Sequence, residues 1–521
     1  MFHIETSTRT RRASSLALSM LIVCGLILTM PNRAPAQDST GGDKLEAIAK
    51  RLEELEKQIE GLKRENAELK KKFGEKEKPS AAPVAEIDTR PTQARETPAA
   101  QGESKPERKE SRIEFGGEIR LRPEVRDSTP DGFFGGVDSF IGQRVRLHAK
   151  VKLTDDLTGF LEVQDSRVWG GEFSTNRSNR GVDLHQAYIQ ADHFLTPHLS
   201  LKIGRQELSY GNERLVGSFD WDFVGRSFDA IKAVYTRKGW SADIFAARLA
   251  DYHDSNILIN VAPGREGEFF FVLPHQEFYG VYLKFLNDKP THKLEAYGFV
   301  LTDNFSSRGE VGKRTDSTGI YTVGARQEMR SKGGFYYDGE AAFQAGHRGP
   351  DDHRALAFAG SVGKYFKSAR SSHFGFEYDF ATGDGDFRDG KSREFIDLFP
   401  NNHIHYGYID FLGWRNMHDF RLNFGFDPAS KLSVDADYHK FLLNKGDGIW
   451  TSASGLFLGF DPSGSSGIEL GQELDFTVRF PYKEHMKFLG GYSLFIPGRF
   501  ARLTRSSDLS HFSYIQTRIS F

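Results

Sequence analysis

The sequence of 521 residues is poor in several features on which common protein classes depend. It contains one cysteine, so no internal disulfide can form. The formal net charge is −2, and so balanced a composition gives no sign of a nucleic-acid partner. The mean hydropathy of −0.50 is too polar for a bundle of membrane helices. Disulfide scaffolds, nucleic-acid binders and helical membrane proteins are therefore not favoured.

Long apolar runs are also scarce, and the one present, residues 13–30, follows a cluster of arginines and precedes Ala-Pro-Ala at 34–36. This order is typical of a secretory signal peptide, which we predict over residues 1–36. The run is nearly long enough to span a bilayer, so an uncleaved anchor is the alternative. Lipidation is not expected, because Val23 precedes Cys24 where a lipoprotein signal has a small residue. The mature chain would have no thiol for metal ligation or nucleophilic catalysis.

A heptad pattern follows, with apolar residues at alternating steps of three and four from Leu45 to Phe73. This predicts an α-helical coiled coil over residues 43–74 that self-associates in the periplasm, with Asn66 at an a position setting the register. A single solvated helix is the alternative. Residues 75–112, rich in Pro, Ala, Lys and Glu, have too few apolar side chains for a core and predict a disordered linker.

From residue 113 onward apolar and polar residues alternate with a period of two, which is typical of strands with two different faces. Aromatics make up 13% of the chain, with 44 Phe and 53 Gly. Eighteen such segments are expected, over residues 113–126, 139–153, 158–168, 183–193, 199–209, 228–237, 240–249, 278–287, 292–302, 320–330, 334–345, 354–366, 372–382, 417–427, 431–441, 470–480, 485–496 and 510–521.

The connections between these segments alternate between short and long, as in a barrel with short periplasmic turns and long extracellular loops. A soluble sandwich or propeller has no reason to alternate in this way. We therefore predict an all-β fold, a transmembrane antiparallel β-barrel of about 18 strands over residues 113–521, in the lipid of the bacterial outer membrane. The chain ends on Phe521, and an aromatic end resembles proteins that the barrel-assembly machinery inserts.

If the first strand starts in the periplasm, its inward face and that of the second strand carry a row of basic residues. The field of such a row would concentrate anions in the pore, and arginine can bind carboxylates with two hydrogen bonds. Solvated or structural ion pairs are the alternative for each residue. Asp165, Arg167 and Arg205 have the wrong parity for the lumen and need a bulge to turn inward. The candidate pore-lining and substrate-binding residues are Arg120, Arg122, Glu124, Arg144, Arg146, Asp165, Arg167, Arg205, Glu207, Arg214, Arg226 and Asp229.

The connection over residues 383–416 is longer than joining two strands requires, and it is rich in aromatics. We expect it to fold inward or over the pore mouth and to control the passage of large solutes. Its candidate pore-loop residues are Phe399, Pro400, His403 and Asp410.

Cofactors and catalysis find little support. Three carboxylates that could hold Ca²⁺ are Asp384, Asp386 and Asp389, although they lack the spacing of an EF-hand loop, and a solvated loop is the alternative. A hydrolase would need a nucleophile, a histidine and a carboxylate together. His185 and His403 are available, but no Gly-x-Ser-x-Gly turn occurs, so no enzyme is predicted.

Three segments, RLRPEVRD from Arg120, GRQELSYGNERLVG from Gly204 and DWDFVGRSFDA from Asp220, together with Phe-x-x-Leu-Phe-Pro-x-x-His over residues 395–403, resemble the alginate-export family of outer-membrane proteins. The resemblance implies an eighteen-strand channel with an electropositive constriction that passes an acidic saccharide such as alginate. A phosphate-selective or general anion porin is the alternative. A structural tether that uses the coiled coil is compatible with either.

Overall fold

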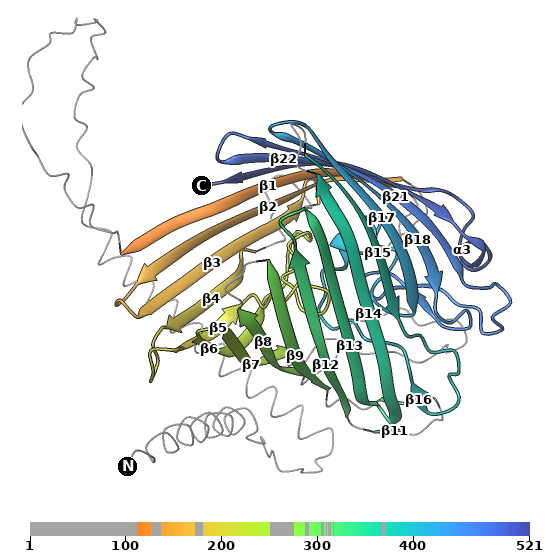
Figure 1. Cartoon of the computed structure of the whole chain (residues 1–521), viewed down its shortest axis with the longest axis horizontal. Coiled ribbons are helices and arrows are strands. Elements are labelled where there is room, and N and C mark those ends of the chain that lie inside the picture. The colour runs from red at the N-terminus through yellow and green to blue at the C-terminus, as the bar shows by residue number, and fades with distance from the viewer. Residues whose placement is uncertain are drawn as a thin grey trace, which may run out of the picture. The chain divides into compact units, whose positions relative to one another are not determined.

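The computed structural model describes residues 112–521 except 128–136, 172–180, 251–275, 287–290, 304–306, 309, 311–313, 316 and 367–370. The predicted signal peptide, the coiled coil over 43–74 and nearly all of the linker lie outside these residues, so their boundaries remain predictions. The described part forms a ring of strands (Figure 1). No helix in the described ranges is long and apolar enough to cross a membrane.

Eighteen antiparallel strands form the ring, and each pairs with its neighbours along the chain, while β1 pairs with β23 and closes it. The first nine are β1 (Ile113–Asp127), β2 (Val137–Lys152), β3 (Leu157–Val168), β4 (Asp183–Ala191), β5 (Leu199–Gln206), β6 (Phe228–Arg237), β7 (Trp240–Ala250), β8 (Gln276–Leu286) and β9 (His292–Asp303). The others are β12 (Thr318–Arg330), β13 (Phe335–Arg348), β14 (Asp351–Phe366), β15 (Ser372–Ala381), β17 (Met417–Ala429), β18 (Leu432–Leu443), β21 (Glu469–Tyr482), β22 (Met486–Pro497) and β23 (Ser510–Ser520).

Short elements occupy the connections. They are β10 (Ser307–Arg308), β11 (Arg314–Thr315), β16 (Lys391–Ser392), β19 (Trp450–Thr451), β20 (Phe457–Gly459), the 3₁₀ turn η1 (Asn402–Ile404) and the helix α3 (Arg499–Thr504). β16 pairs in parallel with the start of β14. These elements belong to the loops and leave the ring's antiparallel order unchanged.

The two faces of the ring have opposite character. On β14, buried and exposed residues alternate from Asp351 to Ala359. The outward side presents large apolar side chains, such as Phe376 at 40% and Ile515 at 64% exposure, whereas the inward side buries polar ones, such as Arg120 at 1%. A water-soluble fold has the reverse arrangement, and an apolar outer band is what a membrane barrel needs. The predicted barrel is therefore confirmed.

The eighteen predicted segments correspond one to one to the strands of the ring, and 228–237 agrees at both ends. The fifth segment was expected to reach residue 209, but β5 ends at Gln206. From there the chain turns into the interior, so Leu208 and Tyr210 continue the alternation of apolar residues without belonging to a strand, and both are buried.

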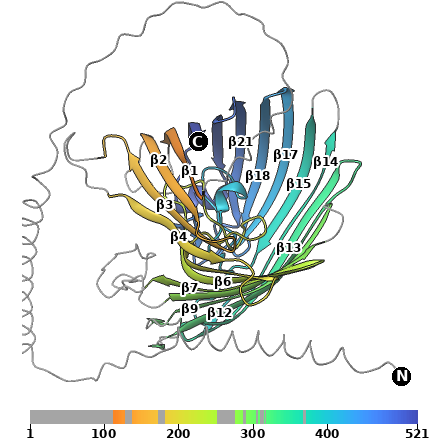
Figure 2. The same cartoon turned by 90° about the vertical axis from the view of Figure 1, so that its left-hand side faces the viewer.

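Two connections fill part of the interior. They comprise residues 207–227, which join β5 to β6, and residues 382–416, which join β15 to β17; Figure 2 shows coloured connecting segments within the ring of strands. Their buried aromatic side chains, including Tyr210, Phe395 and Trp414, pack in one cluster with the inward aromatics of β6 to β9, such as Phe278. The core of this barrel is therefore built between the wall and its own connections.

Candidate functional site: the arginine wall and the two inward segments

Basic side chains line one wall of the interior. β1 and β2 pair so that Arg120 lies directly opposite Arg144. Arg120, Arg122, Arg144 and Arg146 are all at most 7% exposed. Because alternate residues of a strand share a face, the regular sequence of both strands is sufficient to place these four on the same inward wall. Sequence parity predicted this placement.

Carboxylates neutralise only part of this charge. Arg122 Nε lies 2.5 Å from Glu124 Oε1, and Arg144 Nη2 lies 2.7 Å from Glu118 Oε1. Asp220, from the segment 207–227, lies 2.6 Å from Arg144 and 3.4 Å from Arg146. A fifth arginine, Arg518 on β23, also pairs with Glu118 and Asp220. It was not among the predicted site residues, although the parity of the last strand implies its inward position.

The segment 207–227 crosses the interior. While Asp220 contacts the arginine wall, Arg214 forms ion pairs with Glu377 and Asp379 on β15, the latter at 2.8 Å. β15 and β2 are far apart in the ring, since β17, β18, β21, β22, β23 and β1 separate them on one side. The segment therefore links two remote walls and narrows the path between them.

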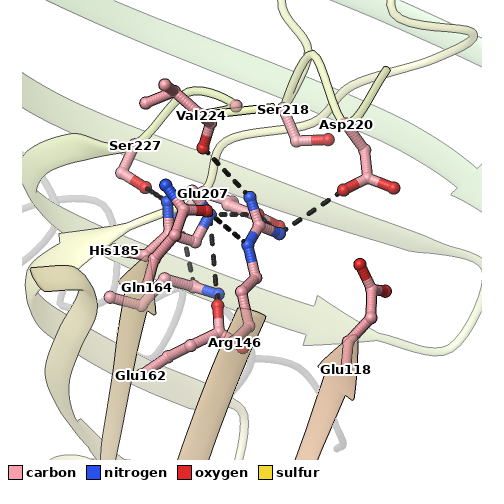
Figure 3. Close-up of polar contacts among 12 residues, drawn as sticks. Glu118, Arg146, Glu162, Gln164, His185, Glu207, Ser218, Asp220, Val224 and Ser227 are labelled. Atoms are coloured by element: carbon pink, nitrogen blue, oxygen red, sulfur yellow. Dashed lines mark hydrogen bonds and ion pairs between the residues drawn. The ribbon is translucent and has the colours of Figure 1, made fainter. Parts of the chain in front are cut away.

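Both ends of this segment are fixed on β4 by one histidine. His185 Nε2 lies 2.9 Å from Glu207 Oε1, and its Nδ1 lies 3.2 Å from Ser227 Oγ (Figure 3). The β3–β4 pairing shifts register next to His185, which lets it face inward beside Gln186. The contacts anchor the two ends of the segment and leave its middle to be held by the arginines.

The second inward segment, 382–416, packs on the first. Phe399 forms a parallel bridge with Val216. Arg226 donates hydrogen bonds to the carbonyl oxygens of Phe399 and Pro400, the latter at 3.0 Å. The ring of His403 stacks on Trp221 at 3.8 Å between centroids. The predicted inward packing of this connection is therefore present, and its pore-loop residues contact the other segment directly.

Asp410 completes this arrangement by accepting a hydrogen bond from His403 Nδ1 at 3.1 Å. Its own backbone has a φ of 65°, which is uncommon for a residue other than glycine. Contacts made by the side chain and the burial of neighbouring Ile409 and Phe411 hold this strained turn in place.

Charges within the two segments have shifted pKa values. Burial opposes ionisation of Asp220, but Arg144 and Arg518 together hold its pKa below the usual range. Burial lowers the pKa of Arg226 to about 10. Burial, reinforced by Arg214, lowers the pKa of His405 well below its usual value. At neutral pH Asp220 is thus anionic, Arg226 cationic and His405 neutral.

A second stretch of the interior wall, from β13 round to β21, is acidic. Buried carboxylates on β13, β15, β17, β18 and β21 belong to Glu340, Asp379, Asp419, Asp437, Glu473 and Asp475. Arg421 offsets part of this charge, since its Nε lies 2.7 Å from Asp437, and His439 Nδ1 lies 2.8 Å from Asp419. Basic and acidic side chains are therefore gathered on different stretches of the interior wall.

A second group of basic residues was missed by the sequence reasoning. Lys202 on β5 and Lys232 on β6 are directly opposed, and Lys202 Nζ lies 4.1 Å from the ring centroid of Tyr188 on β4. Their inward parity follows from the outward position of Ile203, which is 48% exposed. The alternation around Ile203 was the available signal for the inward position of Lys202. That Lys232 lies opposite it depends on the register between the two strands, which the sequence alone does not fix.

Four predicted pore-lining residues face outward instead. Asp165 and Arg167 form an ion pair with each other, and the β2–β3 register runs unbroken past both. Arg205 and Asp229 are directly opposed and pair at 3.3 Å, with side chains 36% and 62% exposed. The bulge needed to turn these side chains inward does not occur at their positions. The register shift between β3 and β4 falls at His185 instead.

The acidic loop does not assemble a metal site. Asp384 accepts hydrogen bonds from the backbone of Asp386 and Arg393, and Asp389 accepts them from Lys391 and Arg393. Among the described residues no three histidine, cysteine or acidic side chains cluster as metal ligands. These carboxylates cap turns, so the geometry gives no support to calcium.

A closed eighteen-strand barrel with an apolar outer face, a charged interior and inward connections is an outer-membrane channel. The chain belongs to the alginate export family, whose model matches residues 111–514. The family and the barrel place it in the bacterial outer membrane.

Solved porins share the fold at low identity. OccAB3 of Acinetobacter baumannii has a TM-score of 0.52 and 10% identity, over 78% of this chain and 99% of that one. OccAB2 of the same organism has a TM-score of 0.51 and 10% identity, over 78% and 98%. A BenF-like porin from Pseudomonas fluorescens Pf-5 has a TM-score of 0.50 and 9% identity, over 78% and 98%. No curated protein matches the chain.

Proposed function

We propose that this channel selectively passes anionic solutes, and that acidic saccharides of the alginate type are its substrate class. The observation that carries the proposal is the convergence of five arginines from three neighbouring strands, Arg120, Arg122, Arg144, Arg146 and Arg518. Guanidinium groups bind carboxylates in a bidentate, planar manner. A low-dielectric wall strengthens their field along the path.

The mixture of signs favours a polymer over a tightly bound ion. Glu118, Glu124 and Asp220 lie among the arginines, and their negative charge weakens the retention of a polyanion along this wall. Successive uronate groups could exchange among neighbouring guanidinium groups while the sugar rings pass the aromatic side chains. Passage requires binding that is favourable enough for entry but weak enough for release.

A general anion or phosphate porin remains the second candidate, and the opposed lysines Lys202 and Lys232 favour it. Lysine acts as a compact point charge and binds phosphate without the planar preference of arginine. In the first candidate the solute passes along the arginines of β1, β2 and β23, and in the second along the lysines of β5 and β6.

Planar-bilayer recording tests both. Under a salt gradient the reversal potential should indicate anion selectivity, and oligouronates should block the current at lower concentration than inorganic phosphate or a neutral oligosaccharide of equal length. Cation selectivity would reject the proposal. Stronger block by phosphate than by oligouronate would favour the second candidate.

A further inference from the structure

Five successive backbone carbonyl groups, of residues 220–224, accept hydrogen bonds from side chains of β1, β2 and β3, four of them from arginines. Arg120 donates to the oxygens of Asp220, at 2.5 Å, and of Asp222. Arg122 donates to the oxygen of Trp221 at 2.8 Å. The main chain of this stretch therefore lies along β1 as a row of acceptors.

Neighbouring strands complete the row. Arg144 donates to the carbonyl oxygens of Asp220 and Asp222 at 3.3 and 3.2 Å. Arg146 donates to that of Val224 at 3.1 Å, and Ser166 on β3 donates to that of Phe223. Within the described residues, none of the five carbonyls accepts a hydrogen bond from a backbone N–H group. Side chains of the wall thus satisfy acceptors that secondary structure normally satisfies.

The guanidinium groups of β1 and β2 are not well matched to the neutral carbonyls of residues 220–224. Arg120 is 1% exposed, yet in the described part of the chain its hydrogen bonds go to neutral carbonyls and it forms no ion pair. It lies directly opposite Arg144 and shares the same two oxygens with it. The Nε atoms of both arginines are buried without a hydrogen-bond partner. Two adjacent guanidinium groups with spare donors are a site for an anion, which a carboxylate would fill more favourably than a carbonyl.

The occupying stretch is also strained and bracketed by flexible positions. Phe219 has a φ of 51°, which costs a residue with a side chain. Gly217 precedes the stretch, and Gly225, with a φ of 74°, follows it. Beyond these points Glu207 and Ser227 remain fixed on His185. The middle can therefore leave the wall without detaching the ends.

We propose that residues 220–224 are an internal ligand of the arginine wall, and that an acidic saccharide opens its own path through the channel by taking the guanidinium donors from these carbonyls. The inference rests on the anion-channel function proposed above. It adds that the resting site is occupied by the protein's own main chain, so solute entry and segment release are one exchange of hydrogen-bond acceptors. The ring centroid of Trp221 lies 3.8 Å from Arg122 Cζ, and the same ring stacks on His403. Trp221 therefore transmits that release to the second inward segment.

A disulfide lock tests the inference. The hydroxyl of Ser166 contacts the backbone of Phe223, so the pair Ser166→Cys and Phe223→Cys should cross-link the seated segment to β3. In bilayers oligouronate should not block the oxidised channel, because the carbonyls of the seated segment keep the guanidinium donors, and a reductant should restore the block seen in the wild type. An oxidised channel that responds as the reduced one does would overturn the proposal.

The controls separate this inference from the function on which it rests. Ser166→Cys alone should respond to oligouronate under both redox conditions. If the reduced channel lacks anion selectivity, the proposed function fails; if it is anion-selective but the lock has no effect, only this inference fails. The ring of Phe223 also covers Gly142, so Gly142→Cys with Phe223→Cys is a second lock. Failure of both pairs to cross-link would show that the segment does not rest on this wall, and would equally overturn the inference.

Discussion

At the scale of single residues, the interior owes its order to buried charges that have specific partners. Arg214 is the clearest case, because it comes from a connection and yet is 5% exposed, with Glu377, Asp379 and the Tyr406 hydroxyl as partners. A charge removed from water is tolerated only when its partners are present, so loss of one partner is costly for the others.

Arg214→Ala should lower the free energy of unfolding by about 3–5 kcal/mol, because Asp379 and Glu377 would remain buried without their cation. Urea unfolding of the barrel in lipid vesicles measures this. Arg354→Ala is the matched control, since Arg354 is 75% exposed and pairs with an exposed Asp352, and its loss should cost less than about 1 kcal/mol. Equal costs would contradict the structural role of Arg214.

Asp220 makes a pH-dependent contribution. Its folded pKa lies below the ordinary 3.8, because Arg144 and Arg518 outweigh its burial. A depressed pKa gives stability that is complete above the unfolded pKa and is lost as pH falls through the folded value. The stability difference between the wild type and Asp220→Asn should therefore be constant above pH 3.8 and shrink on further acidification. A difference that grows in acid would contradict this assignment.

At the scale of elements, the parity of each strand decides which charges the solute meets. Arg144 faces inward and Arg205 outward, although both are arginines of neighbouring regions of the wall. Removing one positive charge from a monovalent anion about 10 Å away in water changes its energy by roughly 0.4 kcal/mol, or about twofold in local concentration.

Arg144→Gln should therefore reduce the anion-to-cation permeability ratio by about fourfold, because the local anion concentration falls and the local cation concentration rises by the same factor, whereas Arg205→Gln should leave it unchanged. Reversal potentials in bilayers distinguish the two. A shift of equal size for Arg205→Gln would mean that its outward position does not describe the conducting channel.

The connection over 382–416 can be removed without breaking the antiparallel ring, because β15 and β17 pair directly with each other and only the short pairing of β16 with β14 is lost. Replacing residues 391–412 by a short linker should leave a folded, heat-modifiable barrel. It should raise single-channel conductance and weaken discrimination between acidic and neutral sugars, since Phe399 and His403 no longer hold the first segment. Unchanged conductance and selectivity would show that this connection does not control passage.

At the scale of the whole molecule, the structure shows the barrel, whereas the coiled coil that precedes it in the sequence is predicted from the sequence alone. The apolar a and d positions of its heptads run from Leu45 to Phe73, with complementary charges at the e and g positions beside them. A peptide of residues 44–73 should self-associate, because an isolated helix would leave the apolar stripe in water. Sedimentation equilibrium checks this, and a monomer at high concentration would remove the coiled-coil assignment.

The sequence by itself determined the strands, their number and the face of most side chains, because the period of two is imposed by backbone geometry and the lipid outside requires apolar residues. It therefore placed Arg120 and Arg144 correctly. The same rule already argued against Asp165, Arg167 and Arg205, and the structure kept them outside because the register is unbroken there.

Only the tertiary structure decided what the arginines bind. Nothing local to residues 220–224 indicates that their carbonyls meet guanidinium groups about 100 positions earlier in the chain, or that Arg214 reaches Glu377 and Asp379 on a remote strand. Those contacts depend on closure of the ring, which brings connections from different hairpins into one interior. Strand periodicity is a local property of the chain, whereas the occupant of the lumen is fixed by packing between segments far apart in sequence.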